Sequence, residues 1–202
     1  MFPKDISKES INMLPIERFE GEIVLIEKKE EIRKALKELE KAKLIGLDTE
    51  TRPAFEKGES YRVALIQLAT EKKVFLIRLH HTGFSKSLIN FLSNPAITKV
   101  GVGLEHDLRN LRKICPFEPA GFIDLSKTAT SLGIKTPGLR SMAGMFLAIR
   151  LSKKEQRSNW ERDALSPSQI VYAATDAWIA LKLYHVLTHL EEEHKKSNHS
   201  AA

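Results

Sequence analysis

Residues 43–50 read Lys-Leu-Ile-Gly-Leu-Asp-Thr-Glu, a short apolar run that ends in two acids. A charged segment precedes the run, and a short apolar stretch bounded in this way predicts a buried strand. Side chains two apart on a strand point to the same face, so Asp48 and Glu50 would project together from its end. Their charges repel unless a cation neutralises them, and carboxylates suit magnesium or manganese. The alternative is a strand whose acids simply meet solvent.

A helix is predicted over residues 167–187. Ser166 can serve as its N-cap, Pro167 suits the first turn, and apolar residues then recur at helical spacing. Positions four apart share a helical face, so Tyr172 and Asp176 are neighbours. The Asp176 carboxylate could bind a metal ion, and the Tyr172 hydroxyl could orient a water molecule. Small alanines around Asp176 would let the helix approach another element closely. The alternative is a surface Asp beside a half-buried Tyr, which is common in helices.

Asp107 is the third acidic position of interest. Residues 97–103 predict a strand that ends in a glycine turn, and a helix begins at Leu104. Asp107 would lie in the first helical turn, where the helix dipole stabilises an acid. The dipole is sufficient to explain Asp107 taken alone, and the adjacent His106 is interpreted as a surface residue rather than a ligand.

The three segments occur in the order Asp-x-Glu, then Asp, then Tyr-x-x-x-Asp. In this order the chain resembles the 3'-to-5' exonucleases that carry four acidic metal ligands and a tyrosine, within the ribonuclease H-like superfamily. Closer still, it is similar to ribonuclease D and to the exonuclease domain of the Werner syndrome helicase. The similarity runs from about residue 23 to residue 190, with further matching residues at 62–69, 100–103, 158–160, 165–166 and 169.

The resemblance implies a role for each matching residue. Asp48 would bridge two divalent cations, Mg²⁺ or Mn²⁺, while Glu50 and Asp176 complete the first site. Asp107 would hold the second cation through water, and Tyr172 would position the attacking water. Two cations about 3.5–4 Å apart can stabilise the attacking and leaving oxygens of a phosphodiester. One departure is the segment 51–55, Thr-Arg-Pro-Ala-Phe, because many Werner-type relatives have tryptophan directly after the glutamate.

The order of elements and the resemblance both predict an α/β fold, a ribonuclease H-like three-layer sandwich. Its mixed sheet should contain about five or six strands flanked by helices. We expect a loosely ordered N-terminal arm at 1–20, the exonuclease domain at 21–190, and a polar, fraying C-terminal tail at 191–202. Within the domain we expect an edge element at 21–26, helices at 30–42 and 85–92, and strands at 44–50, 62–69, 73–79 and 121–125. The short connection 70–72 predicts that the strands on either side of it form an antiparallel hairpin.

Composition favours a polyanionic partner only modestly. The 202 residues support one domain with a sizeable core, and 32 Lys and Arg against 26 Asp and Glu give a net charge of +6. Some basic residues near the acidic segments could offset the repulsion between carboxylates and phosphates, although a solvated face explains any single one. The candidate nucleic-acid contacts are Thr49, Arg109, Lys153, Lys154, Arg157 and Trp160.

Residues 136–160 are open to two interpretations. As a functional flap, this region would grip a 3' end, with Trp160 or Phe146 stacking on a base. As a structural element, it would be a short helix packed on the core, which we favour for Phe146 because apolar residues at helical spacing are usually core. For Trp160 both interpretations stay open.

The resulting hypothesis is a metal-dependent 3'-to-5' exonuclease that releases nucleoside monophosphates from single-stranded or 3'-recessed nucleic acid. The stretch 158–169 is similar to the Werner-type branch and favours DNA over RNA. The first alternative is a nucleic-acid-binding adaptor that keeps the metal site without turnover, and the second is a hydrolase of small nucleotides. We expect no fused helicase and no ribonuclease D-type helical C-terminal module in this chain.

The single cysteine, Cys115, cannot form an internal disulfide, and its apolar neighbours predict a core position. No apolar stretch approaches the roughly 18–20 residues of a transmembrane helix, and the N-terminus lacks the layout of a signal peptide. We therefore expect no membrane association and a cytoplasmic, reducing location.

Overall fold

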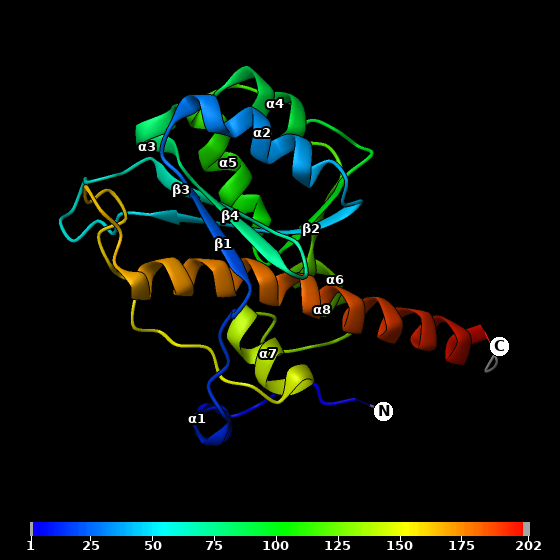
Figure 1. The fold of residues 1–202 in the computed structure, drawn as a ribbon. Helices are drawn as coiled ribbons and strands as arrows, with labels where there is room; N and C mark the ends of the chain where they lie inside the picture. Colours follow the sequence, from blue (N-terminus) through cyan, green and yellow to red (C-terminus); the bar gives the residue numbers. More distant parts are fainter. Residues whose placement is uncertain (1, 200–202) are drawn as a thin grey trace.

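The computed structural model describes residues 2–199 and is built around one six-stranded mixed sheet (Figure 1). The strand order is β1-β4-β3-β2-β5-β6, so β2, which carries Asp48 and Glu50, lies inside the sheet. The predicted fold class and strand number are confirmed. The strands are β1 (Glu22–Ile26), β2 (Leu44–Thr51), β3 (Val63–Ala69), β4 (Lys73–Arg78), β5 (Thr98–Gly101) and β6 (Phe122–Asp124).

Strand directions follow from the length of the connections. The three residues between β3 and β4 produce the predicted antiparallel hairpin, and β2 also pairs antiparallel with β3. Helices intervene between β1 and β4, between β2 and β5, and between β5 and β6, and these three pairs are parallel. The predicted edge element at 21–26 is β1, at the outer edge of the sheet.

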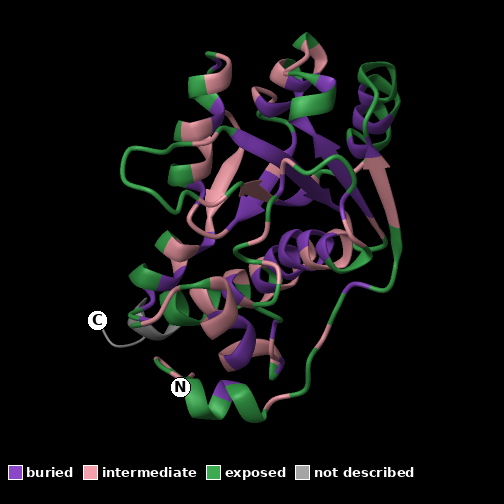
Figure 2. Cartoon of the chain, turned by 90° about the vertical axis from the view of Figure 1, so that its left-hand side faces the viewer, coloured by how far each residue is buried: buried purple, intermediate pink, exposed green. Residues whose placement is uncertain are grey.

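Helices cover both faces of the sheet and complete the three layers (Figure 1). In Figure 2 the inner strands of the sheet and the middle of α8 are among the most buried parts of the chain, whereas the edge strands are of intermediate burial. One face packs on α2 (Lys29–Leu39), α3 (Leu79–Thr82), α4 (Lys86–Leu92) and α5 (Leu104–Ile114). The other face packs on α8 (Pro167–His199), and α6 (Leu125–Ser131) and α7 (Leu139–Leu147) pack against α8.

Helix α8 approaches β2 very closely at Gly46. A Cβ atom built on Gly46 would lie 1.9 Å from the backbone oxygen of Ala177, so only glycine fits there. Gly46 is two residues before Asp48, and Ala177 directly follows Asp176. The predicted use of the small residues is therefore confirmed: they bring the acidic end of β2 against the acidic turn of α8.

The α7–α8 connection (residues 148–166) lies beside the loop between β2 and β3 (residues 52–62). Figure 1 shows the yellow connection and the cyan loop together at one end of the sheet. Arg52 forms an ion pair with Glu161 at 3.7 Å, and the guanidinium carbon of Arg157 lies 5.2 Å from the centre of the Phe55 ring. The two segments thus contact each other near the end of β2 from which Asp48 and Glu50 project.

The N-terminal residues are ordered, and the expectation of a loose arm is wrong for residues 2–20. Helix α1 (Lys8–Met13) has a Ser7 N-cap and buries Ile11. The following residues form a backbone bridge with Arg150, and Phe19 is buried, its N–H donating to Thr175 Oγ1 at 3.0 Å. Apolar residues spaced along the arm hold it against α7 and α8. The division of the chain into arm, domain and tail stays a prediction.

The segment after Leu190 is helical as far as His199, because α8 continues to that residue, and its fraying stays a prediction; residues 200–202 lie outside the described part of the chain. The core position predicted for Cys115 is corrected, since this residue is the C-cap of α5 and is only partly buried. Within residues 2–199 no helix is both long enough and apolar enough to cross a membrane.

Lys99 in β5 gives a testable pH dependence. The side chain is fully buried, and Nζ donates to the backbone oxygens of Asn94 (2.7 Å) and Phe91 (3.4 Å). Burial lowers the pKa of Lys99 from 10.5 to about 8. Between these values the unfolded chain binds more protons than the folded chain, so the stability contribution of Lys99 rises with pH.

We expect the free energy of unfolding of the wild type, relative to Lys99→Met, to increase between about pH 8 and about pH 10. Urea unfolding of both proteins at several pH values measures this difference. A difference that stayed constant across this range would contradict the altered pKa.

Candidate active site

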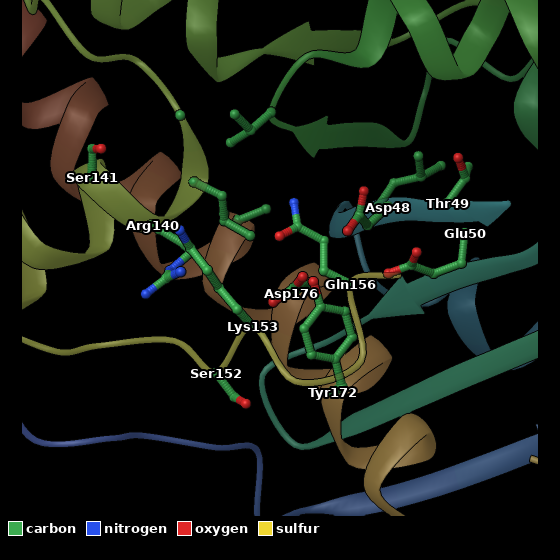
Figure 3. A pocket seen from close by; sticks show the side chains of 15 residues that line it. Asp48, Thr49, Glu50, Arg140, Ser141, Ser152, Lys153, Gln156, Tyr172 and Asp176 are labelled. Atoms are coloured by element: carbon green, nitrogen blue, oxygen red, sulfur yellow. The ribbon is translucent and has the colours of Figure 1, made fainter. Parts of the chain in front are cut away.

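Three carboxylates meet where the end of β2 touches α8. Oxygen atoms of Asp48, Glu50 and Asp176 all lie within 4.8 Å of one another. Asp48 and Glu50 share one side of β2, as the strand periodicity predicted, and Asp176 faces them from the helix (Figure 3). The structure thus places side by side three of the acids that the sequence analysis singled out.

The protein environment opposes ionisation of all three acids. Burial raises the pKa of Asp48 well above its usual range, and the charges of Asp176 and Asp107 add to the effect. Burial, then the charge of Asp48, likewise raises the pKa of Glu50. Burial raises the pKa of Asp176, although hydrogen bonding from Tyr172 and the charge of Arg140 oppose it. The donor set therefore fits cations, because bound positive charge would relieve this repulsion.

Asp107 lies close to the cluster but is not within its 4.8 Å range. It occupies the first turn of α5, as predicted, and Oδ1 accepts a hydrogen bond of 2.6 Å from Thr49 Oγ1. Burial raises the pKa of Asp107, while this hydrogen bond lowers it. Thr49 thus ties the fourth acid to the strand between Asp48 and Glu50.

Tyr172 lies one helical turn before Asp176 and lines the same pocket. Burial, then the negative charges of Asp176 and Glu50, raises the pKa of the Tyr172 hydroxyl far above its usual range, so the group stays protonated and can donate. Behind it, the Trp160 ring lies 6.0 Å away between centroids, inclined at 39°. Trp160 is fully buried, so the tryptophan fixes the position of the tyrosine ring.

The pocket over these residues has a volume of about 440 Å³, large enough for a nucleotide-sized group. One wall carries the acids, and the others come from the first turn of α7 and from the α7–α8 connection (Figure 3). Its lining comprises Leu47, Asp48, Thr49, Glu50, Val102, Gly138, Leu139, Arg140, Ser141, Ser152, Lys153, Gln156, Tyr172, Asp176 and Ala180.

Comparison with known families agrees with this arrangement. A family model described as 3'-5' exonuclease matches residues 23–191, which include all four acids and Tyr172. The chain belongs to the 3'-5' exonuclease family. The exonuclease fold seen here is accordingly that of the ribonuclease H-like enzymes that the sequence resembled.

Individual relatives share less of the chain than the family model does. The human protein named "Exonuclease mut-7 homolog" is 31% identical over 172 residues, covering 71% of this chain and 20% of that protein. "Ribonuclease D" of Haemophilus influenzae is 35% identical over 147 residues, covering 71% and 36%. The solved ribonuclease D of Escherichia coli has a TM-score of 0.75 and 26% identity, covering 84% of this chain and 45% of that one. The chain thus spans less than half the length of each of these relatives.

The predicted nucleic-acid contacts occupy different positions in the exonuclease fold. Thr49 and Lys153 line the pocket, whereas Lys154 and Arg157 lie elsewhere on the α7–α8 connection. Arg109 is exposed on α5, paired with Glu105 at 3.4 Å, and does not line this pocket. These five contacts stay predictions.

Trp160 corrects the sequence interpretation. Stacking on a base requires an exposed ring face, and Trp160 is 0% exposed, so the expectation that it contacts nucleic acid is wrong for this conformation. Phe146 is half-buried, and its ring packs 6.3 Å from that of Phe2 between centroids, which agrees with the packing interpretation.

The sequence interpretation did not include Arg140, Ser141, Ser152 or Gln156, all of which line the pocket. Arg140 carried one usable signal, because it is the charged residue in an otherwise largely apolar helix, α7. Nothing in the residue pattern distinguished Gln156 from other polar residues of an irregular segment.

Proposed function

We propose that the protein is a metal-dependent 3'-5' exonuclease that hydrolyses the terminal phosphodiester bond of a nucleic acid and releases nucleoside monophosphates. The observation that carries the proposal is the meeting of Asp48, Glu50 and Asp176 within 4.8 Å, beside Tyr172 in one open pocket. Family membership supports the same chemistry.

Asp48, Glu50 and Asp176 would hold a first divalent cation, and Asp48 with Asp107 a second. Carboxylate oxygens without histidine or cysteine favour Mg²⁺ or Mn²⁺. When bound, such cations lower the pKa of water and neutralise charge that develops on phosphate oxygens. No side chain of the pocket is then required to act as a general base.

The protein's own groups orient the reactants. The protonated Tyr172 hydroxyl can donate a hydrogen bond and align the attacking water toward phosphorus, and the buried Trp160 ring holds that hydroxyl in place. Thr49 keeps the Asp107 carboxylate turned toward β2 through its 2.6 Å hydrogen bond. Positioning of this kind accounts for much of the rate in phosphoryl transfer.

The preference for DNA rests on the resemblance of residues 158–169 to the Werner-type branch. Here the Gln169 amide donates to Ser158 Oγ at 2.9 Å and to the Asn159 backbone oxygen at 3.1 Å. These contacts hold the α7–α8 connection on α8 and face the protein, not the pocket. DNA therefore stays our proposed substrate on resemblance alone, and the activity assay below tests RNA beside it.

The testing experiment uses 5'-labelled single-stranded DNA, recessed duplex DNA and RNA, each with Mg²⁺, Mn²⁺ or a chelator. We expect a ladder of products shortened from the 3' end that the chelator abolishes. If every substrate were bound but none degraded, the adaptor function would replace the exonuclease. Degradation of free nucleotides alone would indicate the small-nucleotide hydrolase.

Tyr172→Phe tests the orienting role of the hydroxyl. The variant keeps the ring against Trp160 and loses one hydrogen bond near charged groups, which corresponds to a kcat reduced by about 10- to 100-fold. KM should stay unchanged, because the hydroxyl acts on water rather than on the nucleic acid. Steady-state kinetics measures both values, and an unaltered kcat would remove Tyr172 from the mechanism.

A further inference from the structure

Arg140 lies in the pocket on the wall opposite the acids. It comes from the first turn of α7 and lines the same pocket as Asp48, Glu50, Tyr172 and Asp176. In Figure 3 Arg140 and Lys153 lie on one side of the pocket and the carboxylates of Asp48 and Glu50 on the other, with Gln156 between them. The pocket is therefore divided between negative and positive walls.

The Arg140 guanidinium has no hydrogen-bond or ion-pair partner among the side chains that the structure describes, those of residues 2–196. No hydrogen bond or ion pair joins it to the described chain, and its Nε and Nη1 atoms are buried without an acceptor. Nη2 is the nitrogen left accessible. Because a guanidinium is always protonated, this arrangement costs free energy unless an anion completes it.

Neighbouring charges do not supply that anion. Arg150, which the N-terminal segment holds by its backbone bridge to Ile16, places a second positive charge near Arg140. The negative group nearby, Asp176, forms no ion pair with Arg140 and acts on it only at longer range, and it already accepts from the neutral Tyr172 hydroxyl and belongs to the acidic cluster. The positive wall thus remains uncompensated in this part of the chain.

A structural arginine of the same protein looks different. Arg78 is fully buried and donates to Glu27 Oε1 at 2.5 Å, to the Asp163 backbone oxygen at 2.6 Å and to the Arg162 backbone oxygen. Each of its terminal nitrogens has an acceptor. Its Nε is buried without an acceptor, as Arg140 Nε is, but the half-buried Arg140 also lacks an acceptor for its terminal nitrogens, so hydrogen bonding within the fold does not account for it.

We infer that Arg140 is a substrate-binding residue for the phosphate of the 3'-terminal nucleotide, contacting the scissile phosphodiester before cleavage and the 5'-monophosphate product afterwards. This inference rests on the proposed exonuclease function. Carboxylates and bound cations would contact the phosphate from one side, and Arg140 would meet a remaining oxygen from the other. Arginine suits this role because its planar donors match phosphate oxygens.

The test measures binding of a nucleotide and of the matching nucleoside. With Mn²⁺ present, dAMP and deoxyadenosine are titrated into the wild type, Arg140→Met and Arg140→Lys, and kcat/KM is measured on single-stranded DNA. Losing a charge-assisted hydrogen bond should weaken dAMP binding and lower kcat/KM by about 10- to 100-fold in Arg140→Met. Arg140→Lys should recover part of the loss because it keeps the charge, and deoxyadenosine binding should not change.

Arg33→Met is the matched control, since Arg33 is exposed on α2, on the opposite face of the sheet. It should leave both dAMP binding and kcat/KM unchanged. Thermal unfolding of Arg140→Met near that of the wild type separates a binding role from a folding role.

The outcomes distinguish this inference from the proposed function. A wild type that degrades DNA, together with an Arg140→Met variant that binds dAMP equally well, overturns the role of Arg140 and leaves the exonuclease intact. Equal losses for dAMP and deoxyadenosine also overturn it, because they indicate a misshapen pocket. A wild type that degrades nothing but binds dAMP through Arg140 refutes the exonuclease and retains the phosphate site.

Discussion

Asp48→Asn is expected to lower the exonuclease rate by on the order of 10³-fold, because loss of cation binding removes several kcal/mol of transition-state stabilisation. Asp48 is the acid whose ionisation is opposed by the charges of both Asp176 and Asp107, so it lies within electrostatic reach of both. Asparagine keeps the shape of the side chain and removes the charge that would hold two cations. The measurement is the initial rate on 5'-labelled DNA with saturating Mg²⁺ or Mn²⁺.

The same substitution should not destabilise the cation-free protein. Because the pKa of Asp48 is raised in the folded chain, its ionised form opposes folding above the pKa of an unfolded aspartate, which is about 3.9. Thermal unfolding in chelator at pH 8 should therefore show Asp48→Asn at least as stable as the wild type, and added Mn²⁺ should stabilise the wild type more.

Glu71→Gln provides the matched control, since Glu71 is exposed in the turn between β3 and β4, away from this pocket. It removes the same charge without touching the cluster and should keep the wild-type rate. Wild-type activity in Asp48→Asn would refute the assignment of the acidic cluster as the catalytic centre.

Arg78→Met is expected to reduce the free energy of unfolding by roughly 3 kcal/mol. Arg78 is the buried side chain at the end of β4 that joins Glu27 to the backbone of residues 162 and 163. Methionine fills most of the volume but leaves both backbone oxygens without a donor. Urea unfolding followed by circular dichroism measures the change.

The substitution should destabilise the α7–α8 connection more than it destabilises the sheet. Residues 162 and 163 follow Trp160, and releasing them should make the connection more sensitive to limited proteolysis. Exposed Arg33→Met again serves as control and should change the free energy of unfolding by no more than about 0.5 kcal/mol. An Arg78→Met variant as stable as this control would show that the buried contacts of Arg78 do not stabilise the fold.

Local patterns were sufficient for most of the fold and for the acidic residues. The strand 44–50, the hairpin around 70–72 and the helix from Pro167 depend on periodicities and caps that neighbouring residues set. The side-by-side placement of Asp48 and Glu50 follows from the strand period, and that of Tyr172 and Asp176 from the helix period. The sequence by itself therefore determined the architecture and the chemical identity of the site.

The tertiary structure decided which residues surround that chemistry. Trp160 and Arg140 illustrate the difference. Trp160 lies in the irregular α7–α8 connection, where no local period fixes side-chain directions, and Arg140 lies on α7, whose position beside the acids depends on its packing against α8. The burial of Trp160 depends on α8 and the sheet closing over it, and the unpartnered state of Arg140 depends on the absence of an acid opposite it within residues 2–199. Long-range packing, such as the contact of Gly46 with Ala177, sets these positions, and packing between distant segments is not encoded in the spacing of neighbouring residues.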